Sequence, residues 1–209
     1  MASPVLLLRG AGSVGVVLVH DITGLDAFNR SMAERLHREG FWVAAVDLFG
    51  GKTAPNLEEG MKLRAGLTKE HMVAALRADF DRLRAEMGPA AVIGAMGFCM
   101  GGGAALQGAC AVPFAFCVDY YGRIESAADV AGLHGPLLLI LGSEDDRLNP
   151  WAYGELLPKL DEHKKRVRVE LYPGVAHAFH REGWPPYHAA SAKDAWGRAM
   201  AFIRAHGQG

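Results

Sequence analysis

The sequence predicts an α/β protein with a mostly parallel, twisted sheet that is covered by helices on both faces. Two observations carry this prediction. Short apolar stretches without polar alternation, as expected of strands buried on both faces, recur along the chain. Between them lie segments whose apolar residues repeat every three or four positions, as on helices that pack against a sheet. The 209 residues contain no evident linker, repeat or low-complexity tract, so we expect a single domain over residues 1–209.

The composition excludes several classes of partner. Half of the residues are hydrophobic, and 22 Lys and Arg against 23 Asp and Glu leave a net charge of −1, so no global field recruits nucleic acid or a membrane. The apolar start Val5–Leu8 ends at Arg9, which is too short for a secretory signal. Three cysteines without a C-x-x-C pair argue against a disulfide framework or a zinc ribbon. We expect a cytoplasmic protein that is a monomer or a small homo-oligomer.

The first two expected strands are Val5–Leu8 and Gly15–His20. The segment between them, Gly10–Gly15, matches the G-x-G-x-x-G pattern of dinucleotide-binding sites. That fingerprint requires a helix after its last glycine, whereas Val16–Val19 continues as a strand. A hairpin loop that joins two paired strands is therefore preferred to a dinucleotide site.

Strands and helices alternate through the rest of the chain. Apolar residues at helical spacing, closed by glycine or Gly-Pro, predict helices over 28–40 and 72–87. Residues 52–67 predict only loop or a short helix. The other expected strands are Phe41–Val46, Ala91–Met96, Phe114–Asp119, Pro136–Leu141 and Val167–Tyr172. Three later helices are expected: one begins near residue 100, one begins near residue 149, and the last runs over 187–204.

The stretch around Cys99 fits a sharp turn between a strand and a helix. Gly97–Gly101 matches the G-x-nucleophile-x-G elbow, with cysteine where serine is commoner. Glycine is needed at both ends because bulk there would collide with the strand or the new helix. The N-terminus of that helix favours a thiolate at Cys99. The simpler alternative is a cysteine that is merely small enough for a Gly-rich turn, and a phosphate-cradling loop is disfavoured because no Gly-Lys-Ser/Thr follows.

Three chemically useful groups follow the carboxyl ends of predicted parallel strands. They are Cys99, an acid at Asp145 or Asp146, and His177. The order nucleophile, acid, histidine is that of the α/β-hydrolases. In such a site the cysteine attacks an acyl carbon, the histidine moves the proton, and the aspartate holds the imidazole.

The expected site also includes donors for the oxyanion. The backbone N–H groups of Met100 and Ile22 are expected to donate hydrogen bonds to it. His177 and His180, with a nearby aspartate, could be imagined as metal ligands, but a third strong ligand is missing and we expect no metal.

The sequence resembles the dienelactone hydrolase (carboxymethylenebutenolidase) family of α/β-hydrolases over nearly the whole chain. The resemblance implies an α/β-hydrolase fold without a large cap domain, no cofactor, and hydrolysis of a small-molecule lactone or ester that carries a carboxylate. It implies Cys99, Asp145 and His177 as the triad. The resembling motifs lie at residues 19–25, 47–49, 97–102, 142–149 and 172–179.

The resemblance also implies roles for residues outside the triad. Asp21 stands where the family has an acid, usually the longer Glu, that pairs with the resting cysteine. Arg181, four residues after the histidine, stands where the family has an arginine for the substrate carboxylate, and Arg64, with Lys62 as a rival, is the nearest candidate for a second. Solvated surface charges are the simpler interpretation of both arginines. A hydrolase acting on an uncharged ester and a non-catalytic binding protein on this fold remain as alternatives.

Overall fold

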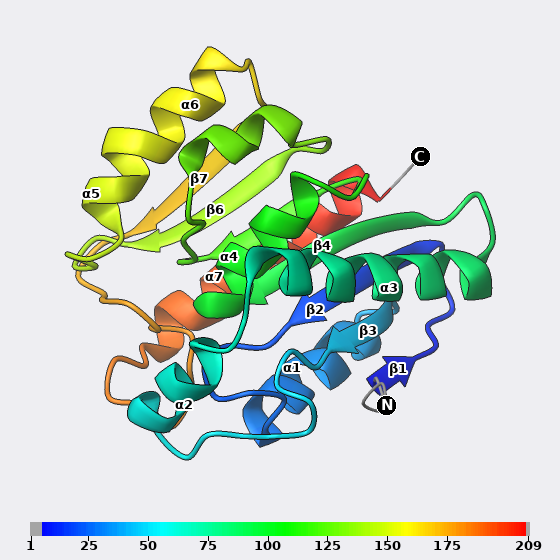
Figure 1. The fold of residues 1–209 in the computed structure, drawn as a ribbon, viewed down its shortest axis with the longest axis horizontal. Coiled ribbons are helices and arrows are strands. Elements are labelled where there is room, and N and C mark those ends of the chain that lie inside the picture. The colour runs from blue at the N-terminus through cyan, green and yellow to red at the C-terminus, as the bar shows by residue number, and fades with distance from the viewer. Residues whose placement is uncertain (1–5, 208–209) are drawn as a thin grey trace.

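A seven-stranded sheet forms the centre of the molecule in this computed structural model, which describes residues 6–207 (Figure 1). The strand order is β1-β3-β2-β4-β5-β6-β7, with β1 antiparallel to β3 and all other neighbours parallel. The mostly parallel sheet predicted from the sequence is confirmed, and the carboxyl ends of its six parallel strands meet at one edge. The strands are β1 (Leu6–Leu8), β2 (Val14–Val19), β3 (Trp42–Val46), β4 (Val92–Phe98), β5 (Cys117–Tyr120), β6 (Leu137–Gly142) and β7 (Val167–Tyr172).

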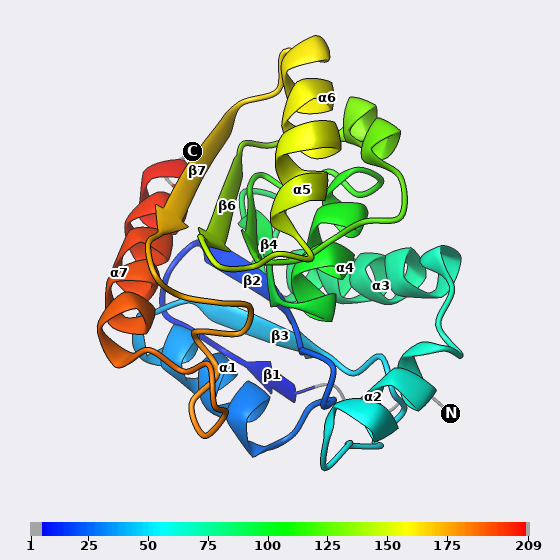
Figure 2. The same cartoon turned by 90° about the vertical axis from the view of Figure 1, so that its left-hand side faces the viewer.

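Helices cover both faces of this sheet (Figure 2). One face carries α1 and α7, and the opposite face carries α3, α4 and α6, while α2 lies beyond the strand ends (Figure 2). A 3₁₀ turn over Ala127–Gly132 and a π-helical turn over Ala152–Leu156 complete the described structure. The helices are α1 (Ala27–Arg38), α2 (Leu57–Arg64), α3 (Lys69–Met87), α4 (Met100–Ala109), α5 (Asn149–Trp151), α6 (Leu157–Glu162) and α7 (Ala189–His206).

Local sequence signals fix the helix ends. Asp26 caps α1 by accepting from the N–H of Asn29 at 2.9 Å, and Thr68 caps α3 in the same way from His71 at 3.2 Å. The chain leaves α3 at Gly88, whose φ of 90° lies in the region that favours glycine. In the sheet, all six residues of β6 are buried, which explains the unbroken apolar run there.

The predicted hairpin at the N-terminus is wrong. Val5 lies outside the described residues, but Leu7 pairs with Ala44 on one side of β3, and Val17 of β2 pairs with the same residue on the other side. The third strand therefore lies between the first two. The loop between β1 and β2 crosses the end of β3, and a side chain at Gly10 would collide with the backbone at Gly40. Since β2 follows this loop directly, the helix of a dinucleotide site is absent at Gly15.

Within residues 6–207, none of the helices combines the length and the hydrophobicity needed to cross a bilayer.

Candidate active site

Cys99 occupies a strained turn between β4 and α4. Its φ of 55° and ψ of −119° are unusual for a residue with a side chain. The backbone holds this geometry because the Cys99 N–H donates to the Tyr120 carbonyl at 2.9 Å, and the Cys99 carbonyl accepts from Gly103 N–H at 3.1 Å. A Cβ at Gly97 would collide with the carbonyl of Gly101, so the glycine requirement read from the motif has a direct steric cause.

A chain of side-chain contacts links Cys99 to an acid. The sulfur lies 3.1 Å from Nε2 of His177, and Nδ1 of His177 lies 2.6 Å from Oδ2 of Asp145. The other carboxylate oxygen of Asp145 accepts from the N–H of Leu148 at 3.1 Å. Asp145 is 2% exposed, whereas Asp146 faces solvent, so the structure places the first of the two acids against the imidazole. We call these three side chains the Cys99–His177–Asp145 relay.

The surroundings of His177 favour its protonated form. Burial alone lowers the pKa of His177, but its hydrogen bonds to Asp145 and Cys99 outweigh burial and raise the pKa to about 10. Burial likewise tends to raise the pKa of Asp145, but the hydrogen bonds from His177 and from the Leu148 N–H bring that pKa below its ordinary value. The relay can therefore hold a proton on the imidazole at neutral pH.

Tyr121 is a neighbour of the relay that the sequence reasoning missed. Its ring centroid lies 5.0 Å from that of His177, and its backbone φ is 45°. The side chain is 2% exposed and forms a wall beside the imidazole. Its position after β5, at the same edge of the sheet as the relay, was the available signal.

The two N–H groups expected at the oxyanion have no acceptor within the described chain. Met100 is the first residue of α4, so its N–H has no intrahelical partner. Ile22 follows β2, and neither its N–H nor that of Met100 donates to any backbone or side-chain acceptor in residues 6–207. Both donors are thus available to an anionic oxygen.

Asp21 contacts other groups than the sulfur. Its Oδ1 accepts from the N–H of Thr23 at 2.9 Å, from the Thr23 hydroxyl at 2.6 Å and from the amide of Asn29 at 3.0 Å. Its Oδ2 pairs with Arg181 at 3.0 Å. Within the described residues, no contact joins Asp21 to Cys99, contrary to the expectation for the resting cysteine. The short Asp side chain is held in this network instead.

Arg181 is buried among protein partners. It is 6% exposed, and besides Asp21 it pairs through Nη2 with Oδ2 of Asp26 at 2.6 Å. Its guanidinium carbon lies 4.2 Å from the centroid of the Phe28 ring. Burial alone would raise the pKa of Asp26, but the hydrogen bond and charge of Arg181 bring it below its ordinary value. The expected partner of Arg181 was a substrate carboxylate, whereas two aspartates occupy that role here.

The second arginine candidate also contacts protein groups. Arg64 donates to the Leu67 carbonyl at 3.0 Å and lies 3.7 Å from Glu125. Its rival Lys62 makes exposed pairs with Glu59 and Glu58 on its own helix. None of these contacts includes a member of the relay.

The two histidines considered as metal ligands do not form a site together. His180 lies between aromatic rings. The centroid of its imidazole is 5.1 Å from that of the Phe98 ring and 6.0 Å from that of the Trp196 ring. Within residues 6–207, no three His, Cys, Asp or Glu side chains are grouped as metal ligands.

Comparison with known proteins places this geometry in a family. The family model of the dienelactone hydrolases matches residues 5–207. The chain belongs to the dienelactone hydrolase family. The structure has the α/β-hydrolase fold of that family, and the prediction from the sequence motifs is confirmed.

Individual relatives are distant. A Saccharolobus solfataricus protein, provisionally named a carboxymethylenebutenolidase, is 26% identical, covering 91% of this chain and 89% of its own. A Bradyrhizobium protein, provisionally named a 2-oxo-3-(5-oxofuran-2-ylidene)propanoate lactonase, is 25% identical, with 91% and 83% covered. The crystal structure of a dienelactone hydrolase-like promiscuous phosphotriesterase from metagenomic libraries has a TM-score of 0.80 at 23% identity, covering 94% of this chain and 87% of its own. As a member of the dienelactone hydrolase family, the protein is a hydrolase.

Proposed function

We propose that this dienelactone hydrolase family member cleaves a lactone or a small ester through Cys99. The observation that carries the proposal is the relay itself, in which 3.1 Å separates Sγ of Cys99 from the imidazole and 2.6 Å separates the imidazole from Asp145. Nucleophile, base and orienting acid within hydrogen-bond reach form the arrangement that acyl transfer requires.

The first half of the reaction forms a thioester. The Cys99 sulfur attacks the acyl carbon, and the carbonyl oxygen becomes an oxyanion that the N–H groups of Met100 and Ile22 stabilise. The C–O bond of the ester or lactone then breaks. The imidazolium of His177 gives its Nε2 proton to the leaving alkoxide, and Asp145 keeps the ring oriented throughout.

The second half releases the acid. Neutral His177 takes a proton from water, and the resulting hydroxide attacks the thioester carbon. The C–S bond breaks, which restores the Cys99 thiolate and the protonated imidazole and leaves a carboxylic acid, which releases its proton to solvent as it departs as the carboxylate. No cofactor or metal takes part in these steps.

The contacts of Arg181 favour an uncharged substrate over a carboxylated one. With Asp21 and Asp26 already paired to it, this guanidinium offers no free charge to a substrate carboxylate. We therefore propose that kcat/KM for neutral esters and lactones is at least about tenfold higher than for carboxylated analogues. A tenfold ratio is a difference of about 1.4 kcal/mol in free energy, roughly the contribution of one charge contact.

The deciding measurement is hydrolysis of a neutral aryl ester, a neutral lactone and a carboxylated dienelactone by the intact protein. Cys99→Ala is expected to abolish turnover of every substrate, while the matched variant Cys110→Ala retains it. Mass spectrometry of the quenched reaction is expected to show an acyl group on the peptide that contains Cys99. Full turnover by Cys99→Ala would overturn the cysteine mechanism, and faster turnover of the dienelactone than of neutral substrates would overturn the substrate assignment.

A further inference from the structure

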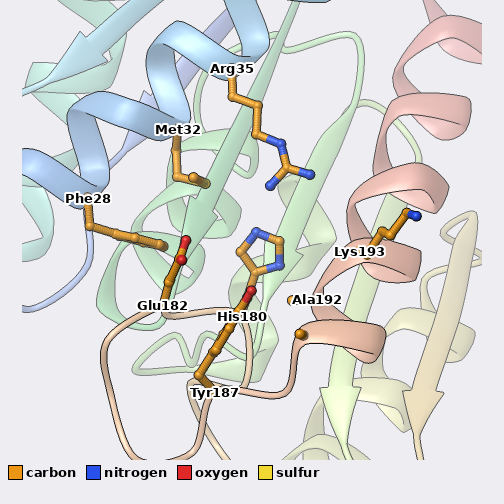
Figure 3. A pocket seen from close by; sticks show the side chains of 9 residues that line it. Phe28, Met32, Arg35, His180, Glu182, Tyr187, Ala192 and Lys193 are labelled. Carbon is orange, nitrogen blue, oxygen red and sulfur yellow. The ribbon is translucent and has the colours of Figure 1, made fainter.

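A small cavity lies apart from the relay, between α1, α7 and the loop that follows His177. Its volume is about 80 Å³, and no member of the relay lines it. Figure 3 shows side chains from all three segments converging on this space. The residues that matter for its chemistry are Phe28, Met32, Arg35, His180, Tyr187 and Lys193.

His180 is a buried polar group that lacks a protein partner in this cavity. The residue is 3% exposed, and its Nδ1 has no hydrogen-bond partner among the described residues. Burial, and to a smaller extent the charge of Arg35, lower the pKa of His180 to about 3, so the ring is neutral at physiological pH. A neutral imidazole carries one N–H donor, and leaving such a group unpaired in a protein interior costs free energy. A bound ligand would offset that cost.

Arg35 and Lys193 line the cavity together with His180, and neither cation has a carboxylate partner in the described chain. The guanidinium of Arg35 lies 4.1 Å from the centroid of the Trp196 ring, which fixes its position, and no ion pair within residues 6–207 includes Arg35 or Lys193. Figure 3 shows the imidazole of His180 directed toward this guanidinium. Glu182 is the acidic side chain in the lining, so the charges of the lining sum to one positive charge. A single negative charge on a ligand balances them.

The remaining lining is apolar. Phe28 and Met32 of α1 face Ala192 of α7 across the cavity, and the ring of Tyr187 lies at its edge (Figure 3). A volume of about 80 Å³ corresponds to several water molecules at roughly 10–15 Å³ each, and hence to an organic ion of roughly half a dozen heavy atoms. An anionic head and a short hydrocarbon tail fit this division of polar and apolar walls.

We propose that this cavity binds a short-chain monocarboxylate such as butyrate. The carboxylate pairs with Arg35 and Lys193 and accepts from the imidazole of His180, and the alkyl chain packs against Phe28 and Met32. A guanidinium held in place by stacking is well suited to bind a carboxylate through two parallel hydrogen bonds.

The test is calorimetric titration of butyrate into protein whose Cys99 has been capped with iodoacetamide, so that binding is measured with the nucleophile blocked. We expect one saturable site, and binding of the neutral isostere butyramide at least about tenfold weaker. A parallel NMR titration is expected to shift the indole N–H of Trp196, the ring on which Arg35 stacks.

Matched variants locate the site. Arg35→Gln and Lys193→Gln are each expected to weaken butyrate binding, and Arg35→Gln by about tenfold or more. Arg38→Gln removes an exposed arginine one turn further along α1, and this variant is expected to bind butyrate with unchanged affinity. Lys193 is exposed, so its variant tests the site without disturbing the core. Equal affinity for butyrate and butyramide, unchanged binding by Arg35→Gln, displacement by inorganic phosphate as effective as by butyrate, or no saturable heat would each overturn the proposal.

Discussion

Arg181 and Asp26 lie 155 positions apart in the sequence, yet Nη2 of the arginine is 2.6 Å from Oδ2 of the aspartate. The arginine comes from the loop after His177, and the aspartate caps α1. With Asp21 on its other amino group, Arg181 joins the two halves of the molecule next to the candidate active site.

Arg181→Gln is expected to destabilise the fold. The variant leaves Asp21 and Asp26 in a largely buried site without their cation, and breaking a buried ion pair in this way costs about 3–5 kcal/mol of unfolding free energy. Urea denaturation measures the loss. Arg198→Gln is the matched control, because its side chain and that of its partner Asp194 are exposed, and its other partner, the half-buried Glu170, keeps its pair with Arg168. Its midpoint is expected to stay close to that of the parent. Unchanged stability of Arg181→Gln, together with a raised KM for carboxylated substrates alone, would instead make Arg181 a substrate ligand.

Alkylation of the native protein is expected to modify one thiol per chain. Cys99 is half-buried at the relay, whereas burial raises the pKa of Cys110 to about 12 and that of fully buried Cys117 well above its ordinary value. Mass spectrometry after brief treatment with iodoacetamide at pH 7.5 should give a single adduct on the Cys99 peptide. Cys99→Ala should then gain no adduct. Rapid labelling of Cys110 in the native state would contradict this ranking.

The contribution of His177 to stability is expected to fade as the pH rises. Its pKa in the folded protein is about 10 against an ordinary value of 6.5, because the hydrogen bonds to Asp145 and Cys99 favour the protonated ring over the effect of burial. A raised pKa means that the folded state binds more protons, so the stabilisation is complete below about pH 6.5 and is lost on passing through pH 10. The difference in unfolding free energy between the parent and His177→Gln should therefore shrink from pH 6 to pH 10. A difference that grows with pH would show that the ring is neutral in the folded state.

Gly97→Ala is expected to damage the site and the fold together. The new methyl group meets the backbone of Gly101, which cannot move without displacing α4, and such overpacking costs about 1–3 kcal/mol or more. Thermal unfolding and ester hydrolysis should both decline. Gly197→Ala on α7 is the matched control, because a methyl group there has open space and favours the helix by about 0.5–1 kcal/mol. A Gly97→Ala protein with full stability would contradict the steric argument for the elbow.

Patterns that depend on neighbouring residues were predictable. The apolar run before Cys99 and the glycines around it fix a buried strand and a tight turn, and the structure confirms the strand with a shift of its end from Met96 to Phe98. Likewise, β7 begins and ends where its alternation predicts, at Val167–Tyr172. The relay was predictable in its placement because three strands of one parallel sheet must end at the same edge.

Patterns that depend on distant partners were not predictable from the sequence. Apolar residues at Leu6–Leu8 indicate a strand but do not say which strand it pairs with, and β3 came between the two expected partners. Asp26 has the sequence signature of a helix cap, and nothing local shows that its second oxygen meets Arg181. The sequence allows His180 as a metal ligand, but it does not show that the ring is enclosed by aromatic neighbours from β4, β5 and α7.

Under the proposed function, the relay also makes hydrolytic activity a late event in folding. Cys99 and His177 are 78 positions apart and Asp145 and His177 are 32 apart, so the contacts depend on β4, β6 and β7 being docked through their crossovers. Such non-local pairings form slowly compared with helices. A refolding chain should therefore regain its helical circular dichroism first. The contact between Cys99 and His177 should form only when the last strands have paired in the sheet. Recovery of ester hydrolysis thus reports the completion of the sheet.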